Sequence, residues 1–342
     1  MFETKLKIQE KFANSILKKK RDLVTQQVQD SSLLSLFTKS FFKILLLCLF
    51  GLVVLIPFAY MILMATMGNQ QADLVKNGQA GIWPNEFKFF GNMKSASNPD
   101  NKGIWPWEAD WQQGYLFSFF LTFCNVLLSI ALKIFVTLFL GYAFSLKKWY
   151  GKEFIWFILM SLLILPEVAL LAGQQWVVLK IKNVVQPDAQ GDTSLFIYNL
   201  FIIAIPFVAS VFNALMYRNA FEAIPSRIKE VAMVDGVVGF KYLFKIAIPM
   251  VSPTTLTIVI LTTLASWNSY LWPSLVAGTD YRVMSVWLFG VGRETSTQDE
   301  RVFDNIRMAG AILVILPMFV FYFLFRKRIM SAISRQGSTI KG

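Results

Sequence analysis

The sequence contains no histidine and only two cysteines among its 342 residues. Without histidine, the chain lacks the commonest metal ligand and the usual general base near neutral pH. Cys48 and Cys124 both lie in apolar runs, so we expect small apolar side chains there rather than a disulfide. No G-x-x-x-x-G-K-[ST] motif occurs, so we do not expect the chain to hydrolyse ATP.

Charged residues are also scarce. They make up 16% of the chain, against about 25% in ordinary soluble domains, and 55% of the residues are apolar. Runs of about 20 apolar residues are long enough to cross the hydrocarbon core as helices. The sequence therefore predicts an all-α, polytopic membrane helix bundle of six transmembrane helices. These are Phe41–Thr66, Tyr115–Ser145, Phe154–Gly173, Leu195–Tyr217, Val251–Val276 and Met308–Phe325.

Lysine and arginine are distributed unevenly between the two sides of these spans. The side that carries both termini holds 22 of the 33 basic residues, although the loops on the other side are longer. The positive-inside rule then places both termini in the cytoplasm of a multi-pass cell-membrane protein. Because the basic residues sort by membrane side, we expect no nucleic-acid partner despite the net charge of +12.

The predicted organisation follows from these spans. We expect a cytoplasmic leader over 1–40, the first transmembrane helix over 41–66, an extracytoplasmic insert over 67–114, a core over 115–328 with a cytoplasmic loop at 218–249, and a cytoplasmic tail over 329–342.

The loop at 218–249 interrupts the apolar pattern with the polar stretch "EVAMVDGVVGFKYLFKIAIP", which begins at Glu230. Ser226 is placed to be the N-cap of a short helix, and Gly236 is placed to end that helix in the left-handed conformation. A second short helix is predicted over Val238–Ile246. The first helix has one face at helical spacing, formed by Ile228, Val231, Ala232 and Asp235.

This stretch resembles the EAA loop of ABC importer membrane subunits. The family pattern reads E-A-A-x-x-D-G-A, then nine positions ending in isoleucine, one further position, and L-P. Valine replaces alanine at Val231 and Val237, and Ile248 replaces the leucine. The residues that match in register are Glu230, Ala232, Asp235, Gly236, Ile246 and Pro249.

Other segments extend the resemblance to the carbohydrate-type permeases of the MalG- and UgpE-like group. They are "LGYAFSLKK" at Leu140, "WNSYLWPSLV" at Trp267, "MAGAILVILP" at Met308 and the ending "GSTIKG". The likeness runs from Leu116 to the C-terminus. The leader and much of the insert are longer than the group's usual pattern.

The resemblance implies a transmembrane domain of the type I importer fold and a role without catalysis. In that family the EAA loop docks on a cytoplasmic ATPase subunit. Glu230 would then be the charged contact with the ATPase, Gly236 the turn, and Asp235 a residue that bonds around the turn. The tail residues Ser338, Lys341 and Gly342 would make a second ATPase contact.

The resemblance also implies the partners. They are a second, non-identical permease, two ATPase subunits that hold ATP and Mg²⁺, an extracytoplasmic solute-binding protein and the lipid bilayer. This chain itself would bind no cofactor and no metal.

Substrate contacts are less defined. Trp267, Asn268, Tyr270 and Trp272 fall where a sugar pathway could form, since aromatic faces stack on sugars and an amide donates and accepts hydrogen bonds. They could equally pack or anchor the bundle. The substrate would be a sugar or oligosaccharide, with glycerol 3-phosphate or a glycerophosphodiester as the alternative.

Two features stay open. Lys133 and Glu167 are charged residues inside predicted spans, where burying a charge in lipid is costly. They could belong to the substrate pathway or could pair with each other. Glu167 could instead be exposed to water near the end of its span. The insert carries "GIWP" twice, at Gly81 and Gly103, which could be a partner or sugar surface or an aromatic belt.

Two other function classes are weaker. A membrane enzyme would need a catalytic group of residues that this histidine-free sequence does not offer. A stand-alone channel or secondary transporter would have no use for an ATPase-docking loop.

Overall fold

The computed structural model describes residues 33–98, 114–146, 149–185, 192–277, 281–294 and 301–338. The predicted leader up to residue 32, the second GIWP segment, Lys341 and Gly342 lie outside the described residues. Two units are separated, 1–60 and 61–342. The first contains most of helix α2 (Leu33–Thr66), and the second contains the end of α2 and all later elements.

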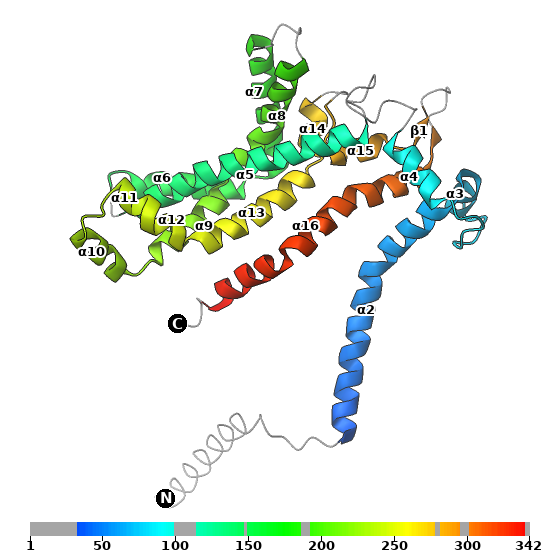
Figure 1. Cartoon of the computed structure of the whole chain (residues 1–342), viewed down its shortest axis with the longest axis horizontal. Coiled ribbons are helices and arrows are strands. Elements are labelled where there is room, and N and C mark those ends of the chain that lie inside the picture. The colour runs from blue at the N-terminus through cyan, green and yellow to red at the C-terminus, as the bar shows by residue number, and fades with distance from the viewer. Residues whose placement is uncertain are drawn as a thin grey trace, which may run out of the picture. The chain divides into compact units, whose positions relative to one another are not determined.

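The described chain is helical (Figure 1). After α2 come α3 (Asn69–Lys76), α4 (Phe89–Ser97), α5 (Tyr115–Ser145), α6 (Lys152–Ser161), the 3₁₀ turn η4 (Leu162–Ile164), α7 (Glu167–Val185), α8 (Asp192–Val208), α9 (Val211–Glu222), α10 (Ser226–Val234), α11 (Phe240–Tyr242), the π-helical turn η5 (Leu243–Ala247), α12 (Ile248–Met250), α13 (Ser252–Trp267), α14 (Leu271–Val276), α15 (Met284–Gly290) and α16 (Asp304–Ser338). Two two-residue strands, β1 (Arg293–Glu294) and β2 (Arg301–Val302), pair antiparallel before α16.

The prediction of an all-α membrane bundle is confirmed. Three helices, Ser40–Thr66, Tyr115–Ser145 and Asp304–Lys327, are each long and apolar enough to cross a membrane, and up to six spans result if each bent helix pair is one span. Two of the bent pairs correspond to the third and fourth predicted spans, and the fourth bends by 57° between α8 and α9, just after Pro206. The remaining pair joins Phe240–Met250 to Ser252–Trp267 with a bend of 69° at Val251, so the fifth predicted span begins at this bend and the first half of the pair lies before the span. Proline removes a backbone donor, which accounts for breaks at these places.

Helix α5 is the centre of the bundle. It packs against α8, α9 and α13, which surround it in Figure 1. Its buried face carries a stripe of polar residues at helical spacing, while Phe120, Phe123, Leu127 and Phe135 are exposed. A membrane helix is expected to turn its polar groups inward in this way, because lipid offers them no hydrogen bonds. The stripe comprises Ser118, Thr122, Asn125, Ser129, Lys133 and Thr137.

Hydrogen bonds join this stripe to neighbouring elements. Asn125 Nδ2 donates to Ser266 Oγ of α13 at 2.9 Å, and the hydroxyl of Thr122 accepts from the Met284 N–H of α15 at 2.8 Å. These bonds fix the register of α5 against α13 and α15.

The contact between α5 and α9 depends on a glycine. A Cβ at Gly141 would lie 2.5 Å from Cβ of Tyr217 and 2.9 Å from the carbonyl oxygen of Ala214. Glycine therefore lets the two helix backbones approach each other closely, as small residues do in membrane bundles.

We expect Gly141→Ala to destabilise the bundle by about 1–3 kcal/mol, because the new methyl group forces α9 away from α5. Gly51→Ala is the matched control, since its added Cβ meets nothing within 4 Å. The thermal midpoint of the purified protein should fall for Gly141→Ala and stay level for Gly51→Ala. Equal midpoints in both variants would contradict this account of the α5–α9 contact.

Candidate functional site

Helix α10 lies at one end of the bundle, beyond the ends of α5 and α13 (Figure 1). It begins at Ser226, and its N-cap is Pro225 in an extended conformation, with no side-chain capping bond. The prediction that Ser226 is the N-cap is therefore wrong by one residue. Pro225 has φ −56° and ψ 135°, so the chain is still extended there and helical geometry begins at Ser226.

The other end of α10 forms a Schellman motif. The Val237 N–H donates to the Ala232 carbonyl at 2.8 Å, and the Gly236 N–H donates to the Met233 carbonyl at 3.1 Å. Gly236 has φ +69°, the left-handed conformation predicted for it. The Asp235 carboxylate makes no hydrogen bond within the described part of the chain, so backbone bonds hold this turn.

Only part of the predicted face of α10 packs against the bundle. Ala232 is buried and Ile228 is half-buried, whereas Val231 is 57% exposed. Val231 thus does not pack against the bundle, although it shares helical spacing with Ile228 and Ala232, because the short helix touches the bundle along one narrow line. Glu230 is exposed, and Val234, four residues further on the same side, is 88% exposed.

The segment after the turn differs from the predicted helix Val238–Ile246. Gly239 has φ +59° and ψ −131°, a conformation open mainly to glycine, and helix begins only at Phe240. It then continues through the π-helical turn η5 and past Pro249 to Met250. The missing N–H of Pro249 explains why the hydrogen-bond pattern widens just before it.

The helices beside α10 rest on one apolar cluster. Ala232 of α10, Leu138 of α5, Tyr217 of α9 and Leu243 of η5 are all buried in it, and Ile246 packs against it. The Tyr217 hydroxyl also donates to the Thr255 hydroxyl of α13 at 3.0 Å. Through Ala232, α10 therefore contacts a cluster that also contains residues of α5, α9 and η5.

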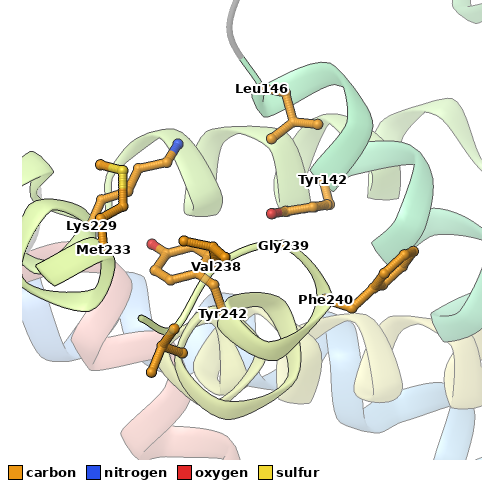
Figure 2. Close-up of a pocket in the computed structure, with 9 residues that line it drawn as sticks. Tyr142, Leu146, Lys229, Met233, Val238, Gly239, Phe240 and Tyr242 are labelled. Atoms are coloured by element: carbon orange, nitrogen blue, oxygen red, sulfur yellow. The ribbon is translucent and has the colours of Figure 1, made fainter. Parts of the chain in front are cut away.

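A cavity of about 360 Å³ opens between α10, α11 and the end of α5. Figure 2 shows the hydroxyls of Tyr142 and Tyr242 and the amine of Lys229 bordering it. Met233, Val238 and Phe240 supply apolar walls. Sequence patterns did not indicate this cavity, since it depends on the turn that brings α10 back towards α5.

The four residues predicted for a sugar pathway lie in two environments. Trp267 and Trp272 are buried, and the Trp272 indole N–H donates to the Ile202 carbonyl at 3.0 Å. Asn268 and Tyr270 are exposed at the break between α13 and α14, where the Tyr270 ring lies 4.4 Å from that of Phe289. The indole of Trp272 thus packs the bundle. A role of any of the four in transport stays a prediction.

Lys133 is buried at 7% exposure, near the middle of α5. Its amine lies 5.8 Å from the centre of the Phe207 ring, at the end of α8, a distance that permits a cation–π interaction. Glu167 begins α7, but its side chain lies outside the described residues, so pairing with Lys133 stays a prediction. The same holds for the side chain of Ser338, the last residue of α16.

A second, larger cavity of about 780 Å³ lies between α5, α13 and α16. Its lining is almost wholly apolar and includes Phe123, Ile260 and Phe321. It offers no group of polar residues to recognise a soluble ligand.

Comparisons with known proteins match this architecture. Residues 138–335 fit the family model of the binding-protein-dependent transport system inner membrane component. A probable ABC transporter permease protein of Mycoplasma pneumoniae is 41% identical, covering 96% of this chain and 97% of its own length. A second such protein, from Mycoplasma genitalium, is 40% identical and covers 88% of each chain.

More distant similarity reaches carbohydrate systems and a solved structure. A probable permease for starch degradation products from Thermoanaerobacterium thermosulfurigenes is 33% identical over 36% of this chain and 44% of its own. The structure of a bacterial ABC transporter involved in import of the acidic polysaccharide alginate superposes with a TM-score of 0.61 at 19% identity, covering 88% of this chain and 99% of the other. This likeness shows a shared fold.

The turn after α10 yields a prediction. Gly236→Val should strain the left-handed position by about 1–2 kcal/mol, whereas Gly236→Asn should be tolerated because asparagine adopts this conformation more readily. Limited trypsin digestion, followed by mass spectrometry of cleavage at Lys229 and Lys241, reports on the loop directly. Cleavage should accelerate in Gly236→Val only, with Gly91→Ala, whose added Cβ meets nothing, as control. Equal rates in the valine and asparagine variants would show that the turn does not need a left-handed residue.

Proposed function

The chain belongs to the family of binding-protein-dependent transport system inner membrane components, and from this we propose that it is one permease subunit of an ATP-driven ABC importer. It forms half of the path through the membrane, and a solute-binding protein delivers the substrate. The chain does not hydrolyse ATP itself. Its partners are a second, non-identical permease and two cytoplasmic ATPase subunits.

The single observation that supports this best is the shape of the α10 loop. A short helix, closed by a Schellman turn, projects at one end of a membrane bundle, with Glu230 and Val234 exposed on its outer side. Such a helix presents a charge and an apolar side chain to a partner, and its inner side rests on α5, α9 and η5. It is suited to pass a movement of the ATPase to the transmembrane helices.

The cavity beside α10 fits the same role. Its apolar walls face open space, and its bordering amine and hydroxyls can bind an acceptor group of a partner. We expect the ATPase to cover it when the complex assembles. The loop, both chain termini and the cavity then all lie on the cytoplasmic side.

A carbohydrate is the substrate class that we propose, because the relatives with the shared segments include permeases named for starch degradation products, arabinooligosaccharides and lactose. Another relative is named for sn-glycerol-3-phosphate transport, which keeps phosphorylated glycerols as the second candidate. Helix α8 ends at Val208 and helix α13 ends at Trp267, and interruptions of this kind within predicted spans are places where a substrate path can form.

Glu230→Ala tests the coupling role. Loss of a charge-assisted contact costs about 1.5–3 kcal/mol, so we expect ATPase binding to weaken roughly tenfold or more. The measurement is transport and ATP hydrolysis by the co-expressed complex in liposomes. Glu153→Ala, which changes another exposed acid, is the matched control. If Glu230→Ala matches wild type in assembly, hydrolysis and uptake, force does not pass through this residue.

A second experiment identifies the substrate. Maltodextrins, simple sugars, glycerol 3-phosphate and glycerophosphodiesters are each added with the binding protein, and stimulated ATP hydrolysis is measured. We expect one carbohydrate to stimulate hydrolysis. Stimulation by a phosphorylated glycerol alone would replace the carbohydrate assignment with the second candidate, and no stimulation by any compound would contradict both.

A further inference from the structure

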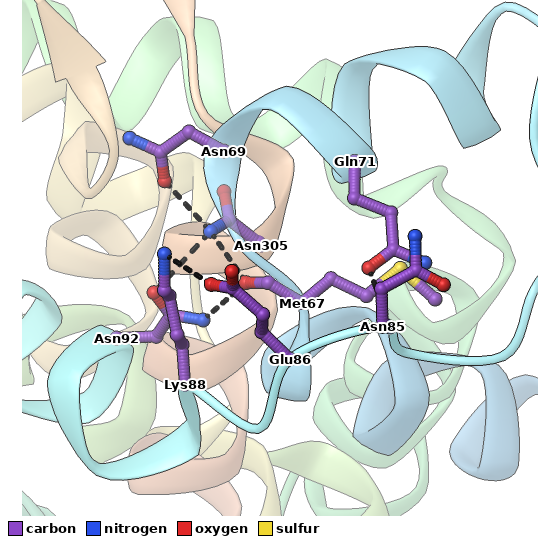
Figure 3. Close-up of polar contacts among 8 residues, drawn as sticks. All are labelled: Met67, Asn69, Gln71, Asn85, Glu86, Lys88, Asn92 and Asn305. Carbon is purple, nitrogen blue, oxygen red and sulfur yellow. Dashed lines mark hydrogen bonds and ion pairs between the residues drawn. The ribbon is translucent and has the colours of Figure 1, made fainter.

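The end of α2 is capped by the insert that follows it (Figure 3). The Asn92 side-chain amide donates to the carbonyls of Ala65 at 2.8 Å and Met67 at 2.7 Å. The Lys88 N–H donates to the Thr66 carbonyl at 2.8 Å. Carbonyls at a helix end usually bond to water or to a cap. Here three consecutive carbonyls bond to protein donors, as suits a helix end at the edge of the hydrocarbon layer, where water is scarce.

The insert is also fixed to the last span. Asn305, at the start of α16, is fully buried and donates to the Met67 carbonyl at 3.1 Å and to Asn69 Oδ1 at 2.8 Å. Lys76 pairs with Asp304 at 2.7 Å. The described insert, residues 67–98, is therefore a rigid bracket between the ends of two membrane helices.

Helix α4 turns one face to the bundle and the other outward. Asn92 and Ala96 are buried, and Phe89 and Met93 pack in a cluster with Ala65. Phe90 points the other way and is 76% exposed. The helix thus lies flat along α16 and leaves an aromatic ring uncovered by the described chain.

The loop before α4 is held in place by hydrogen bonds from the side chain of Gln71. Both ends of the Gln71 amide are used, since Nε2 donates to the Trp83 carbonyl at 2.7 Å and Oε1 accepts from the Asn85 N–H at 2.9 Å. This clamp presents the Trp83 side chain at 79% exposure, and Phe87 follows at 69%. The Phe87 and Phe90 rings lie 6.4 Å apart. We call Trp83, Phe87 and Phe90 the aromatic patch.

We propose that the aromatic patch rests in the interfacial layer of the membrane, in the leaflet at the bundle end opposite to α10. Under the function proposed above, this is the outer leaflet. Ile62, one turn before the capped end of α2, is 51% exposed, so an apolar side chain is also uncovered near the end of the helix that the insert caps. Aromatic rings are enriched at this depth because they are apolar but tolerate the head-group region.

The same contacts argue against a sugar site on the described insert, residues 67–98. Recognition of a sugar needs polar groups that converge beside the aromatic faces. The Gln71 side chain already bonds to the loop backbone, and the side chains of Asn92 and Asn305 already bond to carbonyls at the end of α2. The bracket instead sets the depth of two helix ends in the membrane, whatever solute is transported.

The test uses the complete complex in phosphatidylcholine liposomes. Cys48 and Cys124 are first replaced by alanine, and a polarity-sensitive fluorophore is attached to Trp83→Cys, Phe90→Cys or, as control, Asp73→Cys, an exposed polar position on α3. Spin-labelled lipids quench from a shallow or a deep acyl position. Probes at 83 and 90 should be quenched at least several-fold more by the shallow label than the probe at 73. Equal quenching at all three positions would overturn the proposal.

A second measurement avoids an attached probe. Brominated lipids should quench part of the tryptophan fluorescence of the wild-type protein. This quenched part should be missing in Trp83→Phe. If lipid does not quench Trp83, and the solute-binding protein instead shields it from iodide, the patch is a protein-docking surface and the proposal fails. Uptake in the same liposomes tests the transport function separately, so either idea can fail alone.

Discussion

The structure depends first on the requirement that polar groups inside a membrane find partners within the protein. On helix α5 the polar residues form one buried stripe and several phenylalanines face outward, and within the described chain only Ser118 Oγ and Asn125 Oδ1 of this stripe are buried without a hydrogen-bond partner. Bonds from Asn125 and Thr122 then fix where α13 and α15 lie. The same requirement explains why the end of α2 is capped by side chains and by a backbone N–H of the insert, and why the insert is rigid.

Close packing connects this membrane frame to the α10 loop. Gly141 brings α9 against α5, and Tyr217, on the same contact, reaches Thr255 of α13. Ala232 of α10 belongs to the cluster that contains Tyr217. Interiors packed in this way shift between arrangements rather than deform gradually. A partner bound at α10 therefore contacts a loop whose Ala232 is packed into the bundle.

Sequence patterns predicted the helices better than the contacts between them. Apolar runs predicted six spans, of which the described structure has three as single helices and up to three more as bent pairs, and Gly236 was identified as the left-handed residue of the turn. The cap at Pro225 and the late helix start at Phe240 were missed, because each depends on how the loop rests on the bundle. The cavity at Tyr142 and Tyr242, and the amide bonds of Asn92 and Asn305, join residues far apart in sequence, and no local pattern encodes them.

The turn after α10 has an evolutionary consequence. Its geometry comes from two backbone hydrogen bonds and one left-handed glycine, while Glu230 and Val234 do not support it. Side chains on the outer surface can then be exchanged without changing the shape of the loop. If the loop docks an ATPase as proposed, duplicated transport systems can come to bind different ATPases, or to share one, by altering a few exposed side chains while the turn keeps its shape.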